Sequence, residues 1–414
     1  MTTPRKPYIQ ELRQLPKPIW ILSIGIFLDR FGLFVMPFLV LFITSMGYSC
    51  EAAGFALASM GVGGFLSHVL GGYLSDRIGR RKTIAVAMIG GATCNLLLYV
   101  ATVHSTDLGG LWATYVAAFA MGSVRGMTHS ASGSLVADLV QPEERVAAFA
   151  VIRFAMNLGF ALGMAIAGFV AGHSFLALFL ADAVTSIAFG FIAVSFLPHG
   201  VRSPKSGCGW GTALRHVARN RAFQLACLYA LLTAIVFVQY HSSFSLFLKE
   251  SGYAVYWYGI ILSLNGVLIT IFEMPISALV RRFRPEPVLA LGAILMGAGF
   301  GLNAWIPTAL GLVLAMTVLS FGEMVAMPTQ GAHVANLAPD DMRGRYNGIL
   351  GMAWATSSIV GPMFGLYLLG ISPGILCSVI AAIGILGAGI ILLPAGKAVS
   401  QLTTEQEKDV TAPT

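Results

Sequence analysis

Two charged residues stand side by side in a strongly apolar stretch near the start of the chain. Asp29 and Arg30 interrupt the run IFLDRFGLF, residues 26–34. If this run is helical, Asp29 lies twelve residues after Lys17, which is roughly 18 Å along the axis and about halfway across a hydrocarbon core of roughly 30 Å. Adjacent helical residues point about 100° apart, so the two side chains do not simply pair with each other. We therefore expect at least one of them to face a central cavity or a partner on another helix.

Two further ionisable residues, Arg125 and Glu323, lie inside later apolar stretches. Ionisable groups at such depth are costly and usually functional. Burial favours the neutral form of a carboxylate, whereas a nearby arginine favours the charged form. A protein that alternates between these environments can load a proton on one side and release it on the other. We predict Asp29 and Glu323 as proton-coupling residues and Arg30 and Arg125 as their charge partners or anion contacts, with a buried structural ion pair as the alternative.

Other polar residues in apolar stretches are weaker candidates. Glu273 lies near Pro275 in IFEMPIS, and a proline inside a helix frees backbone groups and bends it, so Glu273 is as well explained by a structural hydrogen bond as by cavity lining. Asp182 is likewise open between a structural and a functional role. The remaining candidates are Arg153, His129, His241 and His333, and buried histidines are more often satisfied core residues than ligands.

Aromatic and methionine residues can supply an adaptable surface for flat hydrophobic substrates. Ordinary packing remains the alternative for each of them. The predicted lining of a substrate cavity comprises Arg30, Phe34, Met36, Phe38, Arg125, His129, Tyr240, His241, Glu273 and Trp354.

The composition is that of a polytopic membrane protein. Hydrophobic residues make up 57% of the 414 and charged residues only 10%, against about 25% charged in a typical soluble domain. A membrane helix needs roughly 17–25 apolar residues. We predict twelve such helices, at residues 19–45, 52–74, 83–103, 108–139, 146–172, 173–197, 222–248, 254–280, 287–306, 308–337, 345–370 and 373–395.

The positive charges predict the orientation of these helices. With a cytoplasmic N-terminus, 21 of the 25 Lys and Arg fall in cytoplasmic segments, as the positive-inside rule requires. Both termini are therefore expected in the cytoplasm. The same bias accounts for the net charge of +7 without a nucleic-acid partner.

The sequence repeats itself once. VLFITSMGYSCEAAG (40–54) is similar to SLFLKESGYAVYWYG (245–259) at an offset of 205, and VADLVQPEER (136–145) to VANLAPDDMR (334–343) at an offset of 198. The expected fold is all-α, with two pseudo-symmetric six-helix bundles in the same orientation. The predicted parts are a first bundle at 1–200, a cytoplasmic linker at 201–221, a second bundle at 222–396 and a tail at 397–414. Parallel repeats of this kind indicate a transporter with its site between the halves.

The repeat also pairs individual positions. Arg125 corresponds to Glu323, and Asp29 corresponds to Ala234. The acidic residue of the first helix therefore belongs to the first half alone. Such asymmetry is expected of specialised roles, although drift would produce it too.

A motif between the second and third helices carries a family resemblance. GGYLSDRIGRRKT (71–83) resembles the G-x-L-x-D-R-x-G-R-R/K loop of the major facilitator superfamily. Small residues let membrane helices approach closely, and a carboxylate can face a helix N-terminus. The resemblance implies a cytoplasmic gate that latches the outward-facing state. Its predicted residues are Gly72, Asp76, Arg77, Arg80 and Asp138.

The resemblance is greatest to the drug:proton antiporter branch, with two departures. That branch carries an arginine where this chain has Ala118, and Arg125 follows seven residues later on roughly the same helical face. Its G-x-x-x-G-P signature appears here as GFALGMAIAG, with Met164 in place of the proline.

Proton-coupled export of small amphipathic molecules is the function we expect. The alternative is proton-coupled uptake of a small organic solute or peptide, because DRFGLFVMPFLVLFI (29–43) resembles the first helix of oligopeptide transporters. Enzyme signatures such as H-E-x-x-H, G-x-S-x-G or a phosphate-binding loop are absent from the sequence, and we expect no cofactor or metal. The expected partners are the substrate, protons or another coupling ion, and membrane lipid, with a monomer in a bacterial inner membrane.

Overall fold

The computed structural model of the chain describes residues 15–104, 108–141, 144–199, 210–306, 308–339 and 343–394, and every regular element within these ranges is an α-helix. The helices of the first half are α2 (Lys17–Phe31), α3 (Val35–Ser45), α4 (Cys50–Ile78), α5 (Arg80–Val103), α6 (Leu108–Arg125), α7 (Met127–Leu139), α8 (Arg145–Ala171) and α9 (Phe175–Phe196). Those that follow are α10 (Trp210–Arg219), α11 (Arg221–Gln239), α12 (Ser243–Glu250), α13 (Val255–Val280), α14 (Pro285–Trp305), α15 (Ala309–Leu337), α16 (Arg343–Ile371) and α17 (Pro373–Ile391).

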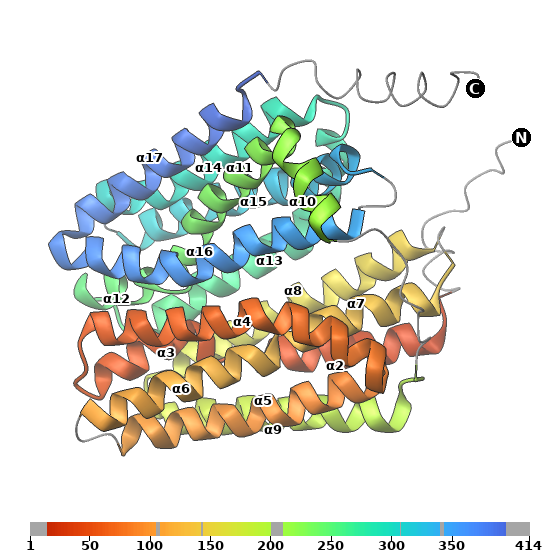
Figure 1. The fold of residues 1–414 in the computed structure, drawn as a ribbon. Coiled ribbons are helices and arrows are strands. Elements are labelled where there is room, and N and C mark those ends of the chain that lie inside the picture. The colour runs from red at the N-terminus through yellow and green to blue at the C-terminus, as the bar shows by residue number, and fades with distance from the viewer. Residues whose placement is uncertain are drawn as a thin grey trace, which may run out of the picture.

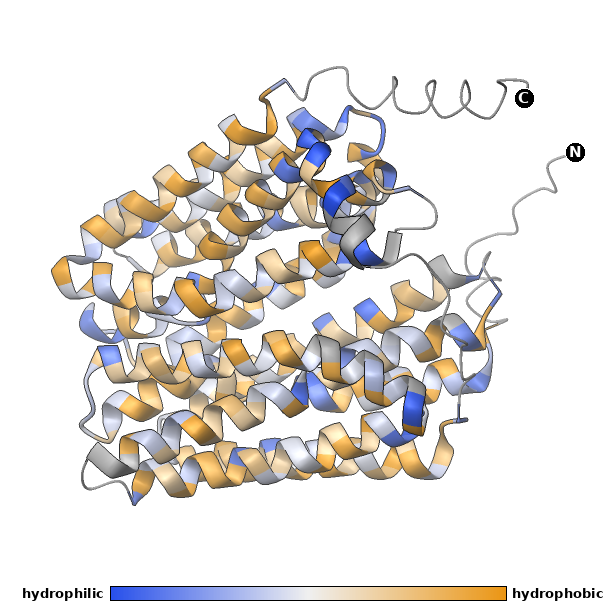
Figure 2. Cartoon of the chain, in the orientation of Figure 1, coloured by the Kyte–Doolittle hydropathy of each residue, from blue (hydrophilic) through white to orange (hydrophobic). Residues whose placement is uncertain are grey.

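Eleven helical segments among the described residues are long and apolar enough to cross a membrane. The expected fourth span, 108–139, is not among them, and the structure divides it at Gly126 into α6 and α7. The count of twelve therefore stays a prediction. Side chains such as Trp112, Val184 and Phe191 point outward, and Figure 2 shows hydrophobic residues along most of the helical surface. The chain is an integral membrane protein.

The helices form two bundles that meet along a long interface (Figure 1). In the first bundle α2 packs on α8 and α9, and in the second α14 packs on α15 and α17. The bundles meet where α8 packs on α13 and α4 on α16. The expected linker 201–221 falls partly outside the described residues, and its last part includes α10.

The first helix of each bundle is broken. The first span divides into α2 and α3 at residues 32–34, and its counterpart divides into α11 and α12 at residues 240–242. Broken membrane helices are tolerated where protein or a cavity satisfies the freed backbone groups. Gly32 at the first break is required sterically, because a Cβ atom there would overlap the Thr185 hydroxyl of α9. The close approach at Gly32 fits the packing of α2 on α9, the helix that carries Asp182.

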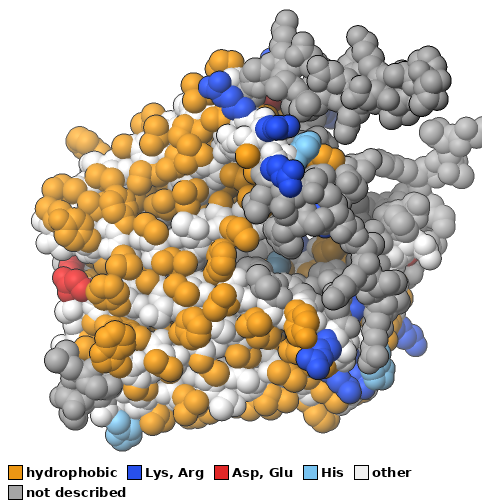
Figure 3. Space-filling view, in the orientation of Figure 1, with side chains coloured by type: hydrophobic (Ala, Val, Ile, Leu, Met, Phe, Trp, Pro, Cys, Tyr) orange, Lys and Arg blue, Asp and Glu red, His pale blue; other side chains and the backbone are white. Residues whose placement is uncertain are grey.

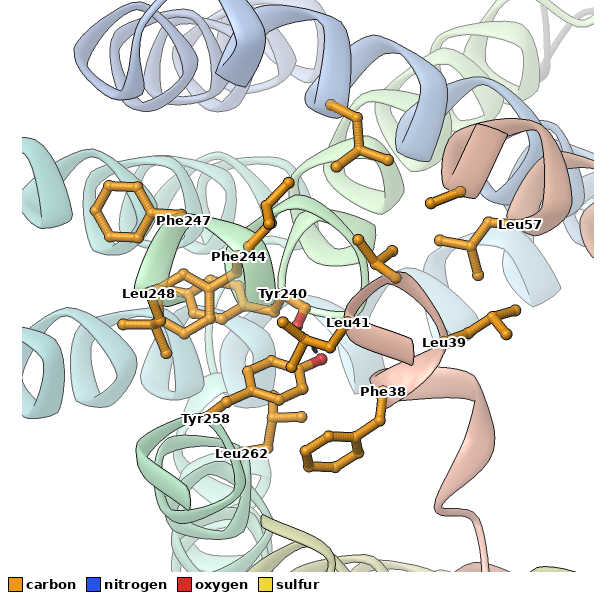
Figure 4. Close-up of a cluster of buried hydrophobic side chains, with 14 of the residues drawn as sticks. Phe38, Leu39, Leu41, Leu57, Tyr240, Phe244, Phe247, Leu248, Tyr258 and Leu262 are labelled. Carbon is orange, nitrogen blue, oxygen red and sulfur yellow. Dashed lines mark hydrogen bonds between the residues drawn. The ribbon is translucent and has the colours of Figure 1, made fainter. Parts of the chain in front are cut away.

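One end of the interface, which we call the closed end, is packed by aromatic residues of both bundles (Figure 4). Phe38 of α3 lies edge-on to Tyr258 of α13, with ring centroids 5.0 Å apart. The Tyr258 hydroxyl lies 3.0 Å from the carbonyl oxygen of Pro37 and 2.9 Å from that of Tyr240. Gly259 packs on α8 so closely that a Cβ atom would lie 2.7 Å from the Gly168 Cα. The two bundles are thus in direct contact here.

The opposite end, which we call the basic end, carries most of the positive charge. Lys and Arg side chains gather there in Figure 3. Among the helix ends, α2 begins at Lys17, α5 begins at Arg80, α10 ends at Arg219, and Arg284 directly precedes α14. The basic residues that the structure describes thus gather on one side, and the cytoplasmic location of this side and of the termini stays a prediction.

Candidate substrate and ion site

Two adjoining cavities lie between the bundles. The larger encloses about 700 Å³ and extends from Asp29 toward the basic end as far as Val136 and Phe149. The smaller encloses about 310 Å³. Both are lined from the first bundle by Arg30 and from the second by Glu323, together with the residues Leu33, Met36, Met60, Met156, Asn157, Phe237, Trp354 and Ser358.

A cluster of charges from three helices forms the wall of the first bundle. Arg125 Nη1 donates to both carboxylate oxygens of Asp182, at 3.0 and 3.1 Å. Its Nη2 atom lies 3.4 Å from Asp29 Oδ1. Arg30 Nε approaches the other oxygen of Asp29 at 3.7 Å, beyond hydrogen-bonding distance. Arg125 is therefore bound firmly to Asp182 and loosely to Asp29.

Asp182 is held by more than its arginine. Its residue is fully buried in α9, the Ser186 hydroxyl lies 3.3 Å from Oδ1, and the backbone of Val35 also hydrogen-bonds to the carboxylate. Asp29, in contrast, lines the larger cavity. The sequence left Asp182 open between two roles, and the structure joins it to Arg125 and Asp29.

The wall of the second bundle holds a different arrangement around Glu323. This carboxylate on α15 accepts a hydrogen bond of 3.0 Å from the Asn265 amide of α13. The same amide lies 3.0 Å from the Ser320 hydroxyl. Asn265 and Ser320 were not predicted. The signal that could have found Asn265 is its position as a polar residue within the apolar stretch 254–280.

A third ionic contact joins the two bundles. Arg153 on α8 donates from Nε to Glu273 Oε2 on α13 at 2.7 Å, and its Nη2 contacts the second carboxylate oxygen. Glu273 was predicted either to line the cavity or to form a structural bond. The structure gives it the structural bond, because Arg153 draws the carboxylate into the seam between α8 and α13.

Most predicted cavity residues line a cavity in the structure. The larger cavity is lined by Asp29, Arg30, Met36, Arg125, His129, Glu323 and Trp354, and the smaller one also by His241. Whether these side chains bind a substrate stays a prediction.

Three aromatic residues of the predicted lining instead lie in the packed core. Phe34 is 3% exposed, and Phe38 and Tyr240 are each 1% exposed. Phe38 packs on Tyr258, and Tyr240 packs on Phe244 and Phe300. Because the breaks in the first and seventh spans turn the chain, residues that follow the breaks pack toward the closed end instead of the cavity.

The predicted gate is partly visible. Arg80 Nε lies 3.1 Å from Asp138 Oδ2, and Arg80 Nη1 donates to the Ser75 carbonyl at 3.3 Å. Arg77 lies instead at the surface, where its Nη1 contacts the Tyr73 hydroxyl at 3.2 Å. Gly72 and Asp76 lie within α4, but their side chains are outside the described residues. The latch function stays a prediction.

Methionines form a part of the lining that the sequence did not reveal. Beyond Met36, the cavities are lined by Met60, Met121, Met156 and Met327. These residues come from α4, α6, α8 and α15, so their convergence depends on how the helices are rotated. Methionine adapts to irregular apolar surfaces. The cavity wall is therefore soft and mainly apolar, with few charged groups.

Similarity to known proteins gives the class of this chain. The sequence profile of the Major Facilitator Superfamily matches residues 19–272 and 257–413, so the chain belongs to this superfamily. It is 28% identical to YttB, an uncharacterized MFS-type transporter of Bacillus subtilis (strain 168), over 85% of this chain and 88% of the relative. The chain is thus a membrane transporter and not an enzyme.

Two other relatives have names that state a function. A Na(+), Li(+), K(+)/H(+) antiporter of Planococcus maritimus is 23% identical, with 80% of this chain and 84% of the relative covered. The class C tetracycline resistance protein of Escherichia coli is 25% identical, with 81% and 85% covered. Both similarities extend through both halves of the chain.

Solved structures share the fold. A POT family transporter in complex with 5-aminolevulinic acid superposes with a TM-score of 0.74 at 16% identity, over 93% of this chain and 97% of the other. A D-xylose-proton symporter has the same TM-score at 16% identity, over 94% and 99%. At this identity the likeness concerns the fold alone.

Proposed function

We propose that the protein is a secondary active transporter that exports small amphipathic molecules in exchange for protons. The basic end is taken as cytoplasmic because positively charged segments remain on that side of a membrane. Both termini then lie in the cytoplasm, and the host membrane is a bacterial inner membrane. With the closed end outside, the larger cavity extends toward the cytoplasm, which corresponds to an inward-facing state.

The observation that carries the proposal is the composition of the cavity wall. Most of it is apolar and includes Met36, Met60, Met121, Met156 and Met327 and the rings of Phe149, Phe237 and Trp354. Two carboxylates, Asp29 and Glu323, face the same space from opposite bundles. An apolar wall suits the hydrophobic part of an amphipathic molecule. Carboxylates in a cavity that alternates between the two sides can take up a proton on one side and release it on the other.

Asp29 is the more favourable proton site of the first bundle. Its contacts with Arg125 and Arg30, at 3.4 and 3.7 Å, are long, and charge-assisted hydrogen bonds are usually near 2.7–2.9 Å. Asp29 is therefore held less tightly than Asp182, which has the closer bond to Arg125. The names of the antiporter and tetracycline resistance relatives agree with exchange and efflux.

Proton-coupled uptake of a small organic solute or peptide is the second candidate. It is favoured by the presence of Arg30 and Glu323 on opposite walls of one cavity, an arrangement that suits a molecule with both charges. The fold likeness to proton-coupled symporters is compatible with this direction.

Proton movement in oriented vesicles distinguishes the two candidates. Inside-out vesicles containing the protein are given a pH gradient and then a panel of amphipathic compounds. Export predicts that a substrate dissipates the gradient, and that vesicles with Asp29→Asn show no such effect. If amphiphiles leave the gradient unchanged while peptides or organic acids carry protons into right-side-out vesicles, the export proposal is replaced by uptake.

A further inference from the structure

The charged side chains around the cavities form pairs, with one carboxylate left over. In the first bundle Arg125 and Arg30 offset Asp182 and Asp29. Across the bundles Arg153 offsets Glu273. Glu323 has the neutral amide of Asn265 as its partner. Within the part of the chain that the structure describes, the ion pairs of this region thus leave Glu323 as the carboxylate without a basic partner in contact.

Aromatic rings from both bundles surround the smaller cavity beside Glu323. His241 lies between Phe237 and Phe160, with ring centroids 5.1 and 6.0 Å from its own. Trp354 is edge-on to Phe237 at 6.0 Å. All four rings line this cavity together with Glu323. Phe160 comes from the first bundle and the other rings from the second, so the pocket exists only where the bundles meet.

An acid and aromatic rings in one apolar cavity attract the same class of ligand. Ring faces attract cations, and this attraction grows when the cation is desolvated. A buried carboxylate without a basic partner gains most from a ligand that brings the missing positive charge. Resting on the function proposed above, we propose that the smaller cavity binds the cationic part of a hydrophobic cation, with Glu323 as counter-charge and Trp354 and Phe237 as ring contacts.

Arg30 also lines this cavity and is the main group that would oppose a cation. Its Nε atom is buried without a hydrogen bond and lies 3.7 Å from Asp29, whose negative charge offsets it. His241 packs between rings and is another group whose protonation would repel a cation. Arg153 and Glu273, the next charged groups, are bound to each other. Among the described residues, the negative charge of Glu323 is therefore the charge of this cavity that no neighbouring opposite charge offsets.

Two probes of equal shape and opposite charge test this inference. Tetraphenylphosphonium and tetraphenylborate are both permanently charged, so neither exchanges a proton with the protein. Binding of each to the full-length protein in nanodiscs is measured by equilibrium dialysis without any pH gradient. The wild type should bind the cation at least about tenfold more tightly than the anion, as expected for one desolvated charge interaction. Equal affinity for the two probes overturns the proposal.

Variants assign the binding to the named side chains. Glu323→Gln should weaken the cation about tenfold or more, and Trp354→Leu about three- to tenfold, whereas Trp354→Phe, which keeps a ring, should weaken it less. Glu250→Gln, whose side chain is exposed, and Trp305→Leu, whose side chain is largely exposed, are the matched controls. An unchanged cation affinity in a monodisperse Glu323→Gln sample contradicts the proposal.

The outcome is separable from that of the proposed function. Binding of tetraphenylphosphonium without any effect on a pH gradient would keep this subsite and refute proton-coupled export. Gradient dissipation by other compounds, with no preference between the two probes, would keep export and refute the subsite. If the anion is preferred, Arg30 and not Glu323 governs the cavity.

Discussion

The two halves of the transporter come from one repeat but carry different charges at matching positions. Asp29 of the first half corresponds to Ala234 of the second, and Arg125 corresponds to Glu323. Asp182, seven residues after the start of α9, corresponds to Ile380, seven residues after the start of α17. The first half therefore has a three-membered ion cluster, and the second has an alanine, a carboxylate and a buried isoleucine.

The difference has energetic consequences. Arg125 and Asp182 are bound by two short hydrogen bonds, and a buried ion pair that loses one partner leaves an uncompensated charge. Glu323 is bound by a neutral amide and can lose its charge without leaving another charge exposed to the apolar interior. The Arg125–Asp182 pair of the first half is thus built to keep its charges, whereas Glu323 of the second half can change its charge.

We therefore infer that the charged residues of the two halves have separate tasks. In the function proposed above, Asp29 is the proton-coupling residue of the first half and lies beside the firm Arg125–Asp182 pair. Glu323 provides a negative charge that a proton or a cationic ligand can neutralise. Each task can be tested by removing one charge.

The largest effect is expected for Arg125→Met. The variant leaves Asp182 buried without its partner, which should destabilise the protein by roughly 3–5 kcal/mol and abolish transport. Thermal unfolding of purified protein in detergent measures the first effect, and substrate-driven proton flux the second.

Two variants serve as controls for the loss of Arg125. Adding Asp182→Asn to Arg125→Met should restore much of the stability, since the unpaired charge is gone, but should not restore transport. Glu323→Gln should change stability by less than about 1 kcal/mol, because the amide still accepts the hydrogen bond of Asn265. If Glu323→Gln destabilised the protein as much as Arg125→Met, the two halves would not differ in the way described.

Asp29→Asn tests the role of the cavity-facing member of the cluster. The substitution removes the proton site and leaves the Arg125–Asp182 pair in place, so folding should be retained while proton-driven flux is lost. The measurement compares flux with and without a pH gradient in proteoliposomes, with the exposed Glu250→Gln as control. Flux that still follows the gradient in Asp29→Asn would move the proton site elsewhere.

Much of the fold could be predicted from the sequence because its signals are local. Apolar length and the basic loops indicate the spans and their ends, and the repeat indicates two like bundles. The positions where helices break could not be predicted in this way, because they depend on packing between helices. These are the division of the fourth span at Gly126 and the breaks after Phe31 and Gln239.

The candidate site was predictable in its charges but less so in its pairings. A charged residue in an apolar span is visible in the sequence, and Asp29, Arg30, Arg125 and Glu323 indeed line one cavity. The partner of each charge depends on how separate helices are rotated and how deep each residue lies. For this reason Asp182 remained open, and Phe38 was expected in the cavity although it packs on Tyr258.

A smaller effect is expected for Tyr258→Phe at the closed end. The hydroxyl is the group that binds backbone carbonyls of both halves, Pro37 and Tyr240, and its loss should cost about 1 kcal/mol. Opening of this end should become about fivefold more frequent. The labelling rate of Leu41→Cys, which is buried in the closed end, measures this opening.

Tyr229→Phe is the matched control for Tyr258. Its hydroxyl is also buried and also donates to a backbone carbonyl, that of Leu289, but within the second half alone. It should destabilise the bundle without changing the labelling rate of Leu41→Cys. Equal labelling rates in both variants would show that the hydroxyl of Tyr258 does not hold the halves together.

The smallest effect is expected for Arg153→Gln. The ion pair with Glu273 crosses between the halves, but the arginine side chain is 47% exposed, and exposed ion pairs contribute roughly 0–1 kcal/mol. The thermal midpoint should therefore hardly change, and the labelling rate at the closed end should stay close to that of the wild type. A drop in stability as large as that of Arg125→Met would mean that lipid shields this pair from water. The two halves would then be joined by a buried charge pair. The contrast between the Arg125–Asp182 pair, which keeps its charges, and Glu323, which can change its charge, would have to be extended to this pair.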